Sequence, residues 1–450
     1  MRKWRLLATC LTVFEPEKFR AALERWAPLG LSLFAIPVFT MAVPPGADMA
    51  MHVALARGLL HGALSPAWGS VRAGLYPEGF SFLVALLSPL GFARAGLIAS
   101  AIAYAIFWAG LAAMLRGPLG APWPKTVALV AVLLSKTPQT FFAWGGNPTA
   151  MALGLSLLGA AALDRQERGA LRAGAIAALL LTAAAFTHPM GACAGGLAAA
   201  AVALRRRAWI AGAIAFGGFA VALGALALFG PHLSPRELSW IREYAAHEER
   251  AGSGVLGDPA NVATALAAAV LIWKRRFRPV ALAAVAICAL LLFLAVAPRA
   301  GLYPARFAPL LLLAAAPLWG LAAAQTRLAP CLFVAAIVAA LPGHIRWYQR
   351  ATPMATRADL AAIECVDRVV PANAVIDGAY GDATQWIPAL TGRAITRPHQ
   401  HCSLFDETDA ALANLPPARW RFVGERLRYP PPIGPPPAST PLCGGQLYPQ

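Results

Sequence analysis

Long apolar runs, separated by short polar segments, recur along most of the chain. A helix that crosses the hydrocarbon core of a bilayer needs about 20 apolar residues, and many of these runs approach that length. The pattern predicts about eleven membrane-spanning helices. They lie at residues 28–43, 95–115, 120–137, 147–163, 171–187, 190–204, 209–229, 259–273, 279–297, 304–323 and 328–342. The expected fold class is therefore an all-α polytopic membrane protein.

One apolar run is not interpreted as a span. Residues 79–91 (GFSFLVALLSPLG) are few, and Pro89 and Gly91 interrupt them. Counting this run as a crossing would move every later basic cluster to the opposite side of the membrane. We therefore expect a helix lying on the outer membrane surface. It would be one of two short helices in a long first outer loop, residues 44–94.

Basic side chains fix the orientation of the spans. They form short clusters at alternate span ends, which the positive-inside rule places in the cytoplasm. The clusters are Arg2, Lys3, Arg5, Lys18, Arg20 and Arg25; Arg116 and Lys125; Arg165, Arg168 and Arg172; Arg205, Arg206 and Arg207; Lys274, Arg275, Arg276 and Arg278; and Arg327. Residues 1–27 are then a cytoplasmic interfacial segment, and residues 343–450 lie outside.

Composition supports the membrane class. Hydrophobic residues make up 58% of the 450-residue chain and charged residues only 13%, whereas soluble domains carry about 25% charged residues. The formal charge of +17 raises the question of nucleic-acid binding. The basic residues lie between apolar runs rather than in a basic groove with interleaved aromatic residues, so nucleic acid is not an expected partner.

The composition changes after residue 342, where the transmembrane domain of residues 28–342 ends. The tail holds a predicted helix (ADLAAIECVDRVV), a predicted strand (NAVIDGAY) and a proline-rich segment (YPPPIGPPP). This pattern predicts a small extracytoplasmic α/β domain. An exported tail would form one disulfide among Cys365, Cys402 and Cys443, with three pairings open. A second outer loop, residues 230–258, contains a further amphipathic helix.

Candidate chemistry begins in the first outer loop. Asp48 and His52 are four residues apart, so on a helix the carboxylate and the imidazole share a face. The pair would abstract a proton, bind a metal or phosphate, or form a structural hydrogen bond. Glu78, in the sequence Tyr76-Pro77-Glu78-Gly79, would either begin the surface helix or position an acceptor for general-base catalysis.

More polar residues fall at later outer turns. Lys136 would reach the outer surface or pair with phosphate. The glycines of Gly145-Gly146-Asn147 would serve a tight turn or let a ligand approach the backbone. His188 would be structural or ligand-binding. Arg299 and Arg306, which flank Tyr303, lie on the outer side, where topology does not explain them. Phosphate binding and lipid head-group contact both remain open for these arginines.

The order of these motifs resembles the GT-C superfamily of polytopic glycosyltransferases, which use polyprenyl-phosphate-linked sugar donors. The resemblance depends on GADMAMH after the first span, YPEG before a juxtamembrane helix, then WGGNP, THP, LYPAR and, in the outer domain, WIPALTGR. It implies inverting sugar transfer to an extracytoplasmic glycan, lipid or protein acceptor, in contact with membrane lipid. It also favours a bacterial inner membrane as the location.

The resemblance also implies residue roles. Asp48 matches the catalytic base, and Glu78 is the alternative for that role. His52 would position the acceptor or, with Asp48, hold a divalent cation, although no cofactor is required by the pattern. Lys136, Arg299 and Arg306 would stabilise the leaving phosphate. Four tail residues would bind the acceptor or serve the fold: Trp386, Arg393, His399 and His401.

Two other classes of function are compatible with the sequence. A transporter or lipid flippase is one, although internal repeats and broken helices near the membrane midplane, which are common in transporters, are not evident. A non-catalytic GT-C-like membrane protein is the other. In that case the acids and arginines would face lipid rather than a shared site.

Overall fold

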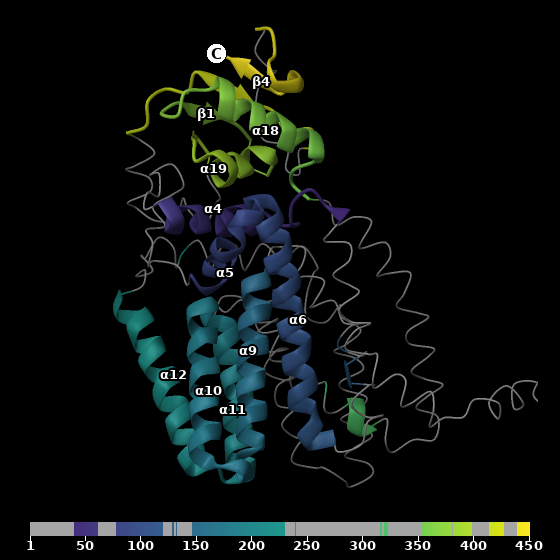
Figure 1. Cartoon of the computed structure of the whole chain (residues 1–450), viewed down its shortest axis with the longest axis vertical. Helices are drawn as coiled ribbons and strands as arrows, with labels where there is room; N and C mark the ends of the chain where they lie inside the picture. The colour runs from purple at the N-terminus through teal and green to yellow at the C-terminus, as the bar shows by residue number, and fades with distance from the viewer. Residues whose placement is uncertain are drawn as a thin grey trace, which may run out of the picture.

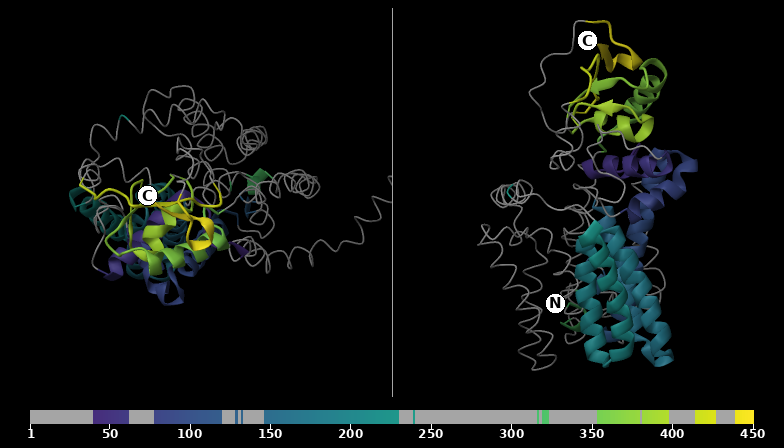
Figure 2. Two further views of the ribbon diagram at one scale, coloured as in Figure 1. Left: turned by 90° about the horizontal axis from the view of Figure 1, so that it is seen from above. Right: turned by 90° about the vertical axis from the view of Figure 1, so that its left-hand side faces the viewer.

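The computed structural model describes residues 40–61, 78–119, 128–129, 132, 146–229, 239, 316, 319–322, 353–379, 381–397, 414–426 and 439–450. These residues form three stacked parts (Figure 1). A bundle of long helices lies at one end, a layer of short helices crosses above it, and the C-terminal domain covers that layer. A second view, from the side, shows the same order of parts (Figure 2).

Five long helices form the described part of the bundle. They are α6 (Phe92–Leu119), α9 (Asn147–Asp164), α10 (Ala170–Thr187), α11 (Pro189–Arg206) and α12 (Trp209–Phe229). Among the described residues, three stretches are long and apolar enough to cross a membrane: Phe92–Arg116, Ala170–Thr187 and Trp209–Leu228. The structure thus supports the predicted multi-pass membrane protein.

Small residues allow these helices to approach closely. A Cβ atom on Gly110 of α6 would lie 2.3 Å from the backbone oxygen of Gly154 on α9. Likewise, a Cβ on Gly195 of α11 would lie 2.2 Å from the Ser156 Cβ, also on α9. Helices in lipid gain stability mainly from such close packing, since water does not drive their apolar faces together.

The layer above the bundle comes from the predicted first outer loop. Helix α4 (Ala47–His61), helix α5 (Gly79–Leu87) and the short turn η2 (Ser88–Leu90) form it. The prediction of two short helices in this loop is confirmed. Gly91 adopts a φ of 88°, which favours glycine, and α6 begins at the next residue. The stretch 79–91 is therefore a separate short helix and not part of a span.

One side of this short helix is apolar and exposed. Phe82 and Leu86 of α5 and Leu90 of the adjoining turn η2 are spaced four residues apart and are 57%, 63% and 51% exposed. The opposite side, with Phe80 and Val84, is fully buried. An apolar stripe on a helix of this length, joined directly to a membrane-crossing helix, is typical of a segment lying in the membrane interface.

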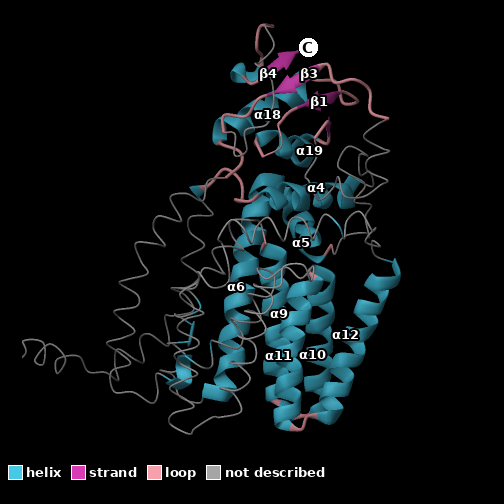
Figure 3. Cartoon of the chain, turned by 180° about the vertical axis from the view of Figure 1, so that it is seen from behind, coloured by secondary structure: helices cyan, strands magenta, loops and turns pink. Residues whose placement is uncertain are grey.

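The C-terminal domain is a small mixed sheet with helices (Figure 3). Its elements are α18 (Arg357–Val369), β1 (Val375–Asp377), η6 (Ala383–Gln385), α19 (Trp386–Thr391), β2 (Ala394–Ile395), β3 (Trp420–Phe422), η8 (Cys443–Gly445) and β4 (Leu447–Pro449). The strand order is β2-β1-β3-β4. Strand β1 pairs in parallel with β2 and β3, and β4 is antiparallel to β3. The predicted helix and strand of the tail are confirmed, although the strand is shorter than its sequence pattern.

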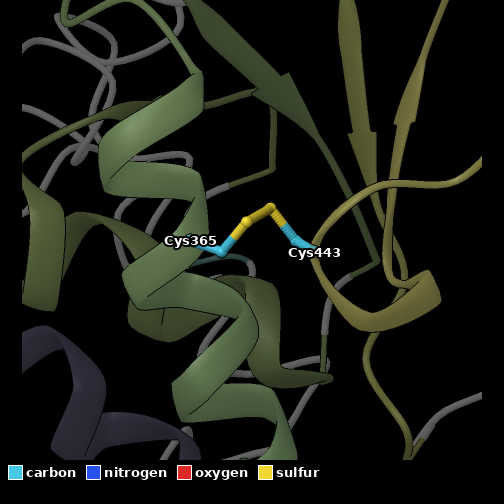
Figure 4. The surroundings of a disulfide bond; sticks show 2 residues. All are labelled: Cys365 and Cys443. Atoms are coloured by element: carbon cyan, nitrogen blue, oxygen red, sulfur yellow. A yellow bond between two sulfur atoms is a disulfide. The ribbon is translucent and has the colours of Figure 1, made fainter.

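A disulfide joins the two ends of this domain. Cys365 on α18 is bonded to Cys443 in η8, 78 residues further along (Figure 4). This bond selects one of the three pairings that the sequence left open. A cross-link over such a long loop restricts the unfolded chain and so stabilises the domain. Disulfides persist mainly outside the cytoplasm, which agrees with an extracytoplasmic tail.

The C-terminal domain and the short-helix layer share one hydrophobic core. Its fully buried members include Val53 of α4, Phe80 of α5, and Trp386 and Ile387 of α19. Arg57 of α4 also donates a hydrogen bond to the Leu390 carbonyl oxygen of α19 at 3.0 Å. The tail is therefore seated directly on α4.

Of the basic clusters, the one at the end of α11 lies at the far end of the bundle. Asp164, the last residue of α9, accepts hydrogen bonds from Arg205 at 2.6 Å and from Arg206 at 2.7 Å at the end of α11. The starts of α9 and α11 are at the opposite end, next to the short-helix layer (Figure 1). The arginine cluster at the ends of α9 and α11 and the disulfide-bonded domain thus occupy opposite ends, which agrees with the positive-inside rule for a multi-pass protein with an exported tail.

The crossing of α6 and α9 gives a matched pair of glycine variants. We expect Gly110→Ala to destabilise the bundle by about 1–3 kcal/mol, because the new methyl group would overlap the α9 backbone. Gly224→Ala on α12 is the control, since nothing lies within 4 Å of a Cβ added there. Thermal unfolding of the purified protein would measure both. Equal unfolding temperatures for the two variants would contradict the close crossing.

Candidate functional site

Four helices begin at the same end of the bundle. Asp48 lies in the first turn of α4, and α5, α9 and α11 begin at Gly79, Asn147 and Pro189. These starting points carry the sequence motifs GADMAMH, YPEG, WGGNP and THP. Direct contacts join the four starts into one group.

The first contact joins α4 to α5. The His52 ring packs edge-on against the Phe80 ring, with centroids 5.5 Å apart and an interplanar angle of 73°. His52 is only 2% exposed, whereas Asp48 is partly exposed. Both residues lie on α4, as their spacing predicted. The carboxylate is thus the more accessible member of the pair, and the imidazole is packed inward beneath the start of α5.

The second contact joins α4 to α9 and α6. The Asn147 side-chain amide nitrogen donates to the Met49 sulfur at 3.0 Å and to the Ser100 hydroxyl oxygen at 3.0 Å. Asn147 is the first residue of α9 and is fully buried. Because Met49 follows Asp48 in the chain, this amide fixes the first turn of α4, and with it the Asp48 backbone, over the bundle.

The third set of contacts joins the start of α5 to the end of α10, just before α11, and joins the start of α11 to the start of α9. A Cβ atom on Gly79 would lie 2.7 Å from the Thr187 hydroxyl oxygen and 3.1 Å from the Phe186 carbonyl oxygen. Only glycine therefore fits at the start of α5. Similarly, a Cβ on Gly191, in the first turn of α11, would lie 2.5 Å from the Thr149 carbonyl oxygen in the first turn of α9.

These helix starts favour negative charge. The backbone N–H groups at a helix N-terminus carry a partial positive charge that attracts anions such as phosphate. The residues at the N-cap positions of α5, α9 and α11 form no capping hydrogen bond through a side chain. The group therefore combines a carboxylate on α4 with three helix ends of positive potential.

The structure brings together six of the residues predicted from sequence: Asp48, His52, Glu78, Gly146, Asn147 and His188. Glu78 and Gly146 occupy the positions just before α5 and α9, and His188 the position just before α11. Six others lie outside the described residues and stay predictions: Tyr76, Lys136, Gly145, Arg299, Tyr303 and Arg306. Within the described ranges, no group of three histidine, cysteine or acidic side chains is placed to hold a metal ion. The divalent cation at Asp48 and His52 therefore also stays a prediction.

The described tail residues with a suggested acceptor role serve the fold. Trp386 is fully buried in the core shared with α4. Arg393, 6% exposed, forms an ion pair with Asp367 and donates two hydrogen bonds to the Val370 carbonyl oxygen at 3.0 and 2.7 Å. His399 and His401 lie outside the described residues.

Sequence reasoning missed Arg57. Besides its bond to Leu390, its guanidinium lies 5.4 Å from the centre of the Phe92 ring at the start of α6. Burial lowers the pKa of Arg57, an effect that nearby Asp367 opposes. A basic residue on the predicted outer side departs from the positive-inside pattern, as Arg299 does, and that departure was the signal available in the sequence.

A second missed residue is Asp382, at the start of η6. Its two carboxylate oxygens accept hydrogen bonds from the backbone N–H groups of Thr384 at 2.8 Å and Gly424 at 3.2 Å. Asp359 holds the neighbouring Glu425 N–H at 2.9 Å. Burial raises the pKa of Asp382 to about 6, although these hydrogen bonds favour the charged form. Two buried carboxylates thus fix the segment after β3.

The raised pKa of Asp382 predicts a pH dependence of stability. The folded domain binds this proton more tightly than the unfolded chain does, so stability declines as pH rises from about 4 through 6. The pKa difference corresponds to about 3 kcal/mol. Tryptophan-detected thermal unfolding of the full-length protein, which holds buried Trp386 in this domain, would show this decline. Asp382→Asn should flatten it, and an identical pH profile in the variant would contradict the assignment.

Comparison with known proteins adds no family to this description. No protein-family model matches the chain, and no curated protein is significantly similar to it. The functional argument therefore depends on the arrangement of this chain's own residues at the end of the bundle.

Proposed function

We propose that this protein transfers a sugar from a polyprenyl-phosphate-linked donor to an extracytoplasmic acceptor, with inversion at the anomeric carbon. One observation supports this most: a carboxylate on α4 is held above three converging helix starts, at the end of the bundle opposite the arginine cluster. A carboxylate beside a region of positive potential suits the deprotonation of a hydroxyl near a phosphate leaving group.

Asp48 is the proposed general base. It would take the proton from the acceptor hydroxyl as that oxygen attacks the anomeric carbon of the donor. The bond from this carbon to the phosphate oxygen breaks, and the polyprenyl phosphate leaves with the electron pair. Attack from the face opposite the leaving group inverts the configuration. Asp48 fits this role better than His52 because its side chain is partly exposed, whereas His52 is buried against Phe80. Glu78, just before α5, is the alternative base.

Negative charge develops on the departing phosphate. The starts of α5, α9 and α11 would stabilise it through their backbone N–H groups. Lys136, Arg299 and Arg306 are proposed to contribute full positive charges at the same site. A divalent cation held by Asp48 and His52 would serve the same purpose in a metal-dependent variant of the mechanism.

The apolar side of α5 suits a lipid-linked substrate. Phe82, Leu86 and Leu90 would lie in the membrane interface, which brings the start of α5 to the level of lipid head groups. A donor with a long polyprenyl chain presents its phosphate at this depth. We propose a bacterial inner membrane as the location, and a glycan, lipid or protein on the outer side as the acceptor.

A transfer assay tests this function. The full-length protein in lipid nanodiscs would be supplied with decaprenyl-phosphate-linked pentoses and hexoses and a mixed glycan and lipid acceptor fraction. Asp48→Asn should lower the transfer rate by roughly 100-fold to 10,000-fold, the usual loss on removing a general base. The exposed carboxylate Glu364 on α18 provides the matched control, and Glu364→Gln should retain the full rate.

Two results would contradict the proposal. Wild-type rates in both Asp48→Asn and Glu78→Gln, with intact folding, would show that neither carboxylate acts as the base. Movement of the donor across the bilayer without release of free polyprenyl phosphate would instead indicate a flippase or transporter.

A further inference from the structure

The orientation of the Asn147 amide is fixed by its neighbours. The Ser100 hydroxyl donates its single hydrogen to the Gly96 carbonyl oxygen at 2.8 Å. The Ser100 oxygen can then only accept from Asn147, so the atom facing it must be the amide nitrogen. The same nitrogen faces the Met49 sulfur. A flipped amide would place its oxygen against two groups that offer it no hydrogen.

The amide oxygen is consequently turned away from both partners. The Asn147 Oδ1 atom is buried and accepts no hydrogen bond. A buried acceptor without a hydrogen bond lowers the stability of the fold by about 1–3 kcal/mol. Such groups are rare in folded proteins, and an unpaired one needs a donor from outside the chain, such as a ligand or an ordered water.

A second atom of this kind lies in the same group of helix starts. The hydroxyl of Ser81, in the first turn of α5, is fully buried and has no hydrogen-bond partner. Gly79, two residues earlier, touches the end of α10, and Phe80 touches His52 of α4. The starts of α5 and α9 thus each hold a buried polar atom that the protein itself does not satisfy.

The chemistry of Oδ1 restricts its ligand. A neutral amide oxygen accepts hydrogen bonds and offers none, so it recognises a donor group such as a sugar hydroxyl and not an ionised phosphate oxygen. It belongs to the residue that positions Met49, next to Asp48 in the chain. We infer that Asn147 binds a sugar hydroxyl through Oδ1 while its amide nitrogen holds α4, an assignment that rests on the proposed sugar transfer.

Binding measurements with defined probes test this subsite. Dissociation constants would be measured for the full-length protein in nanodiscs with decaprenyl phosphate alone and with decaprenyl-phosphate-linked pentoses and hexoses. At least one sugar-bearing lipid should bind more tightly than the bare lipid phosphate. Asn147→Leu should remove that increment, weakening the sugar lipid roughly threefold to tenfold, the value of one hydrogen bond. Affinity for bare decaprenyl phosphate should not change.

The matched control is another buried hydroxyl on α9, away from the helix starts. Ser156 packs against Gly195 of α11 and its hydroxyl has no hydrogen-bond partner, so Ser156→Ala should retain the sugar increment. If Asn147→Leu fails to fold, single-deoxy analogues of the preferred sugar test the same contact in the wild-type protein. Removal of one particular hydroxyl should then weaken binding by the same threefold to tenfold.

The sugar hydroxyl would come from either the donor or the acceptor, and the same binding assay distinguishes the two. If the hydroxyl belongs to the donor, the sugar-bearing lipids show the increment. If it belongs to the acceptor, the free pentose or hexose shows the loss in Asn147→Leu instead. Sugar binding in both forms that is unchanged by Asn147→Leu, or by every deoxy analogue, would overturn the subsite and leave a structural water as the partner of Oδ1. Absence of transfer from these donors would instead refute the proposed function.

Discussion

Helix α4 is held from two sides by hydrogen bonds near its opposite ends. Below, the Asn147 amide joins Met49 at its first turn to the start of α9. Above, Arg57 in its later part donates to the Leu390 carbonyl oxygen of the C-terminal domain. Both contacts link parts of the chain that are far apart in sequence, so the place of Asp48 depends on the bundle and on the tail together.

The rest of the described structure supports this arrangement through close packing. Gly79 and Gly191 let the starts of α5 and α11 approach backbone atoms of neighbouring helices, where no side chain would fit. The Cys365–Cys443 disulfide and the carboxylates of Asp359 and Asp382 keep the covering domain compact. The proposed sugar transfer would need such rigidity, because a small displacement of the base from the acceptor hydroxyl lowers the reaction rate strongly.

Much of the described fold was predictable from the sequence, for a simple physical reason. A membrane-crossing helix must be apolar over about 20 residues, so the runs that form α6, α10 and α12 are visible without any tertiary contact. The apolar runs that form α9 and α11 are visible in the same way. Basic clusters at alternate span ends then placed the first outer loop, the start of α9 and the His188 turn on the same side of the membrane. Their grouping around Asp48 follows from that shared side, although which residues touch does not.

What the sequence could not predict depends on long-range contacts. Three cysteines in the tail allow three pairings, and only the folded path of the chain into η8 brings Cys443 to α18. Nothing local marks Asp382 as buried, because its partner Gly424 is 42 residues away. The unsatisfied oxygen of Asn147 is likewise invisible until Ser100 and Gly96 are placed beside it.

Cross-linking of engineered cysteines measures the convergence of helix starts most directly. In the full-length protein, Met49→Cys combined with Asn147→Cys should form a disulfide on mild oxidation, detected as a linked peptide by mass spectrometry. Leu60→Cys, at the exposed far end of α4, combined with Asn147→Cys should not. Equal yields for the two pairs, or no link between positions 49 and 147, would contradict the account.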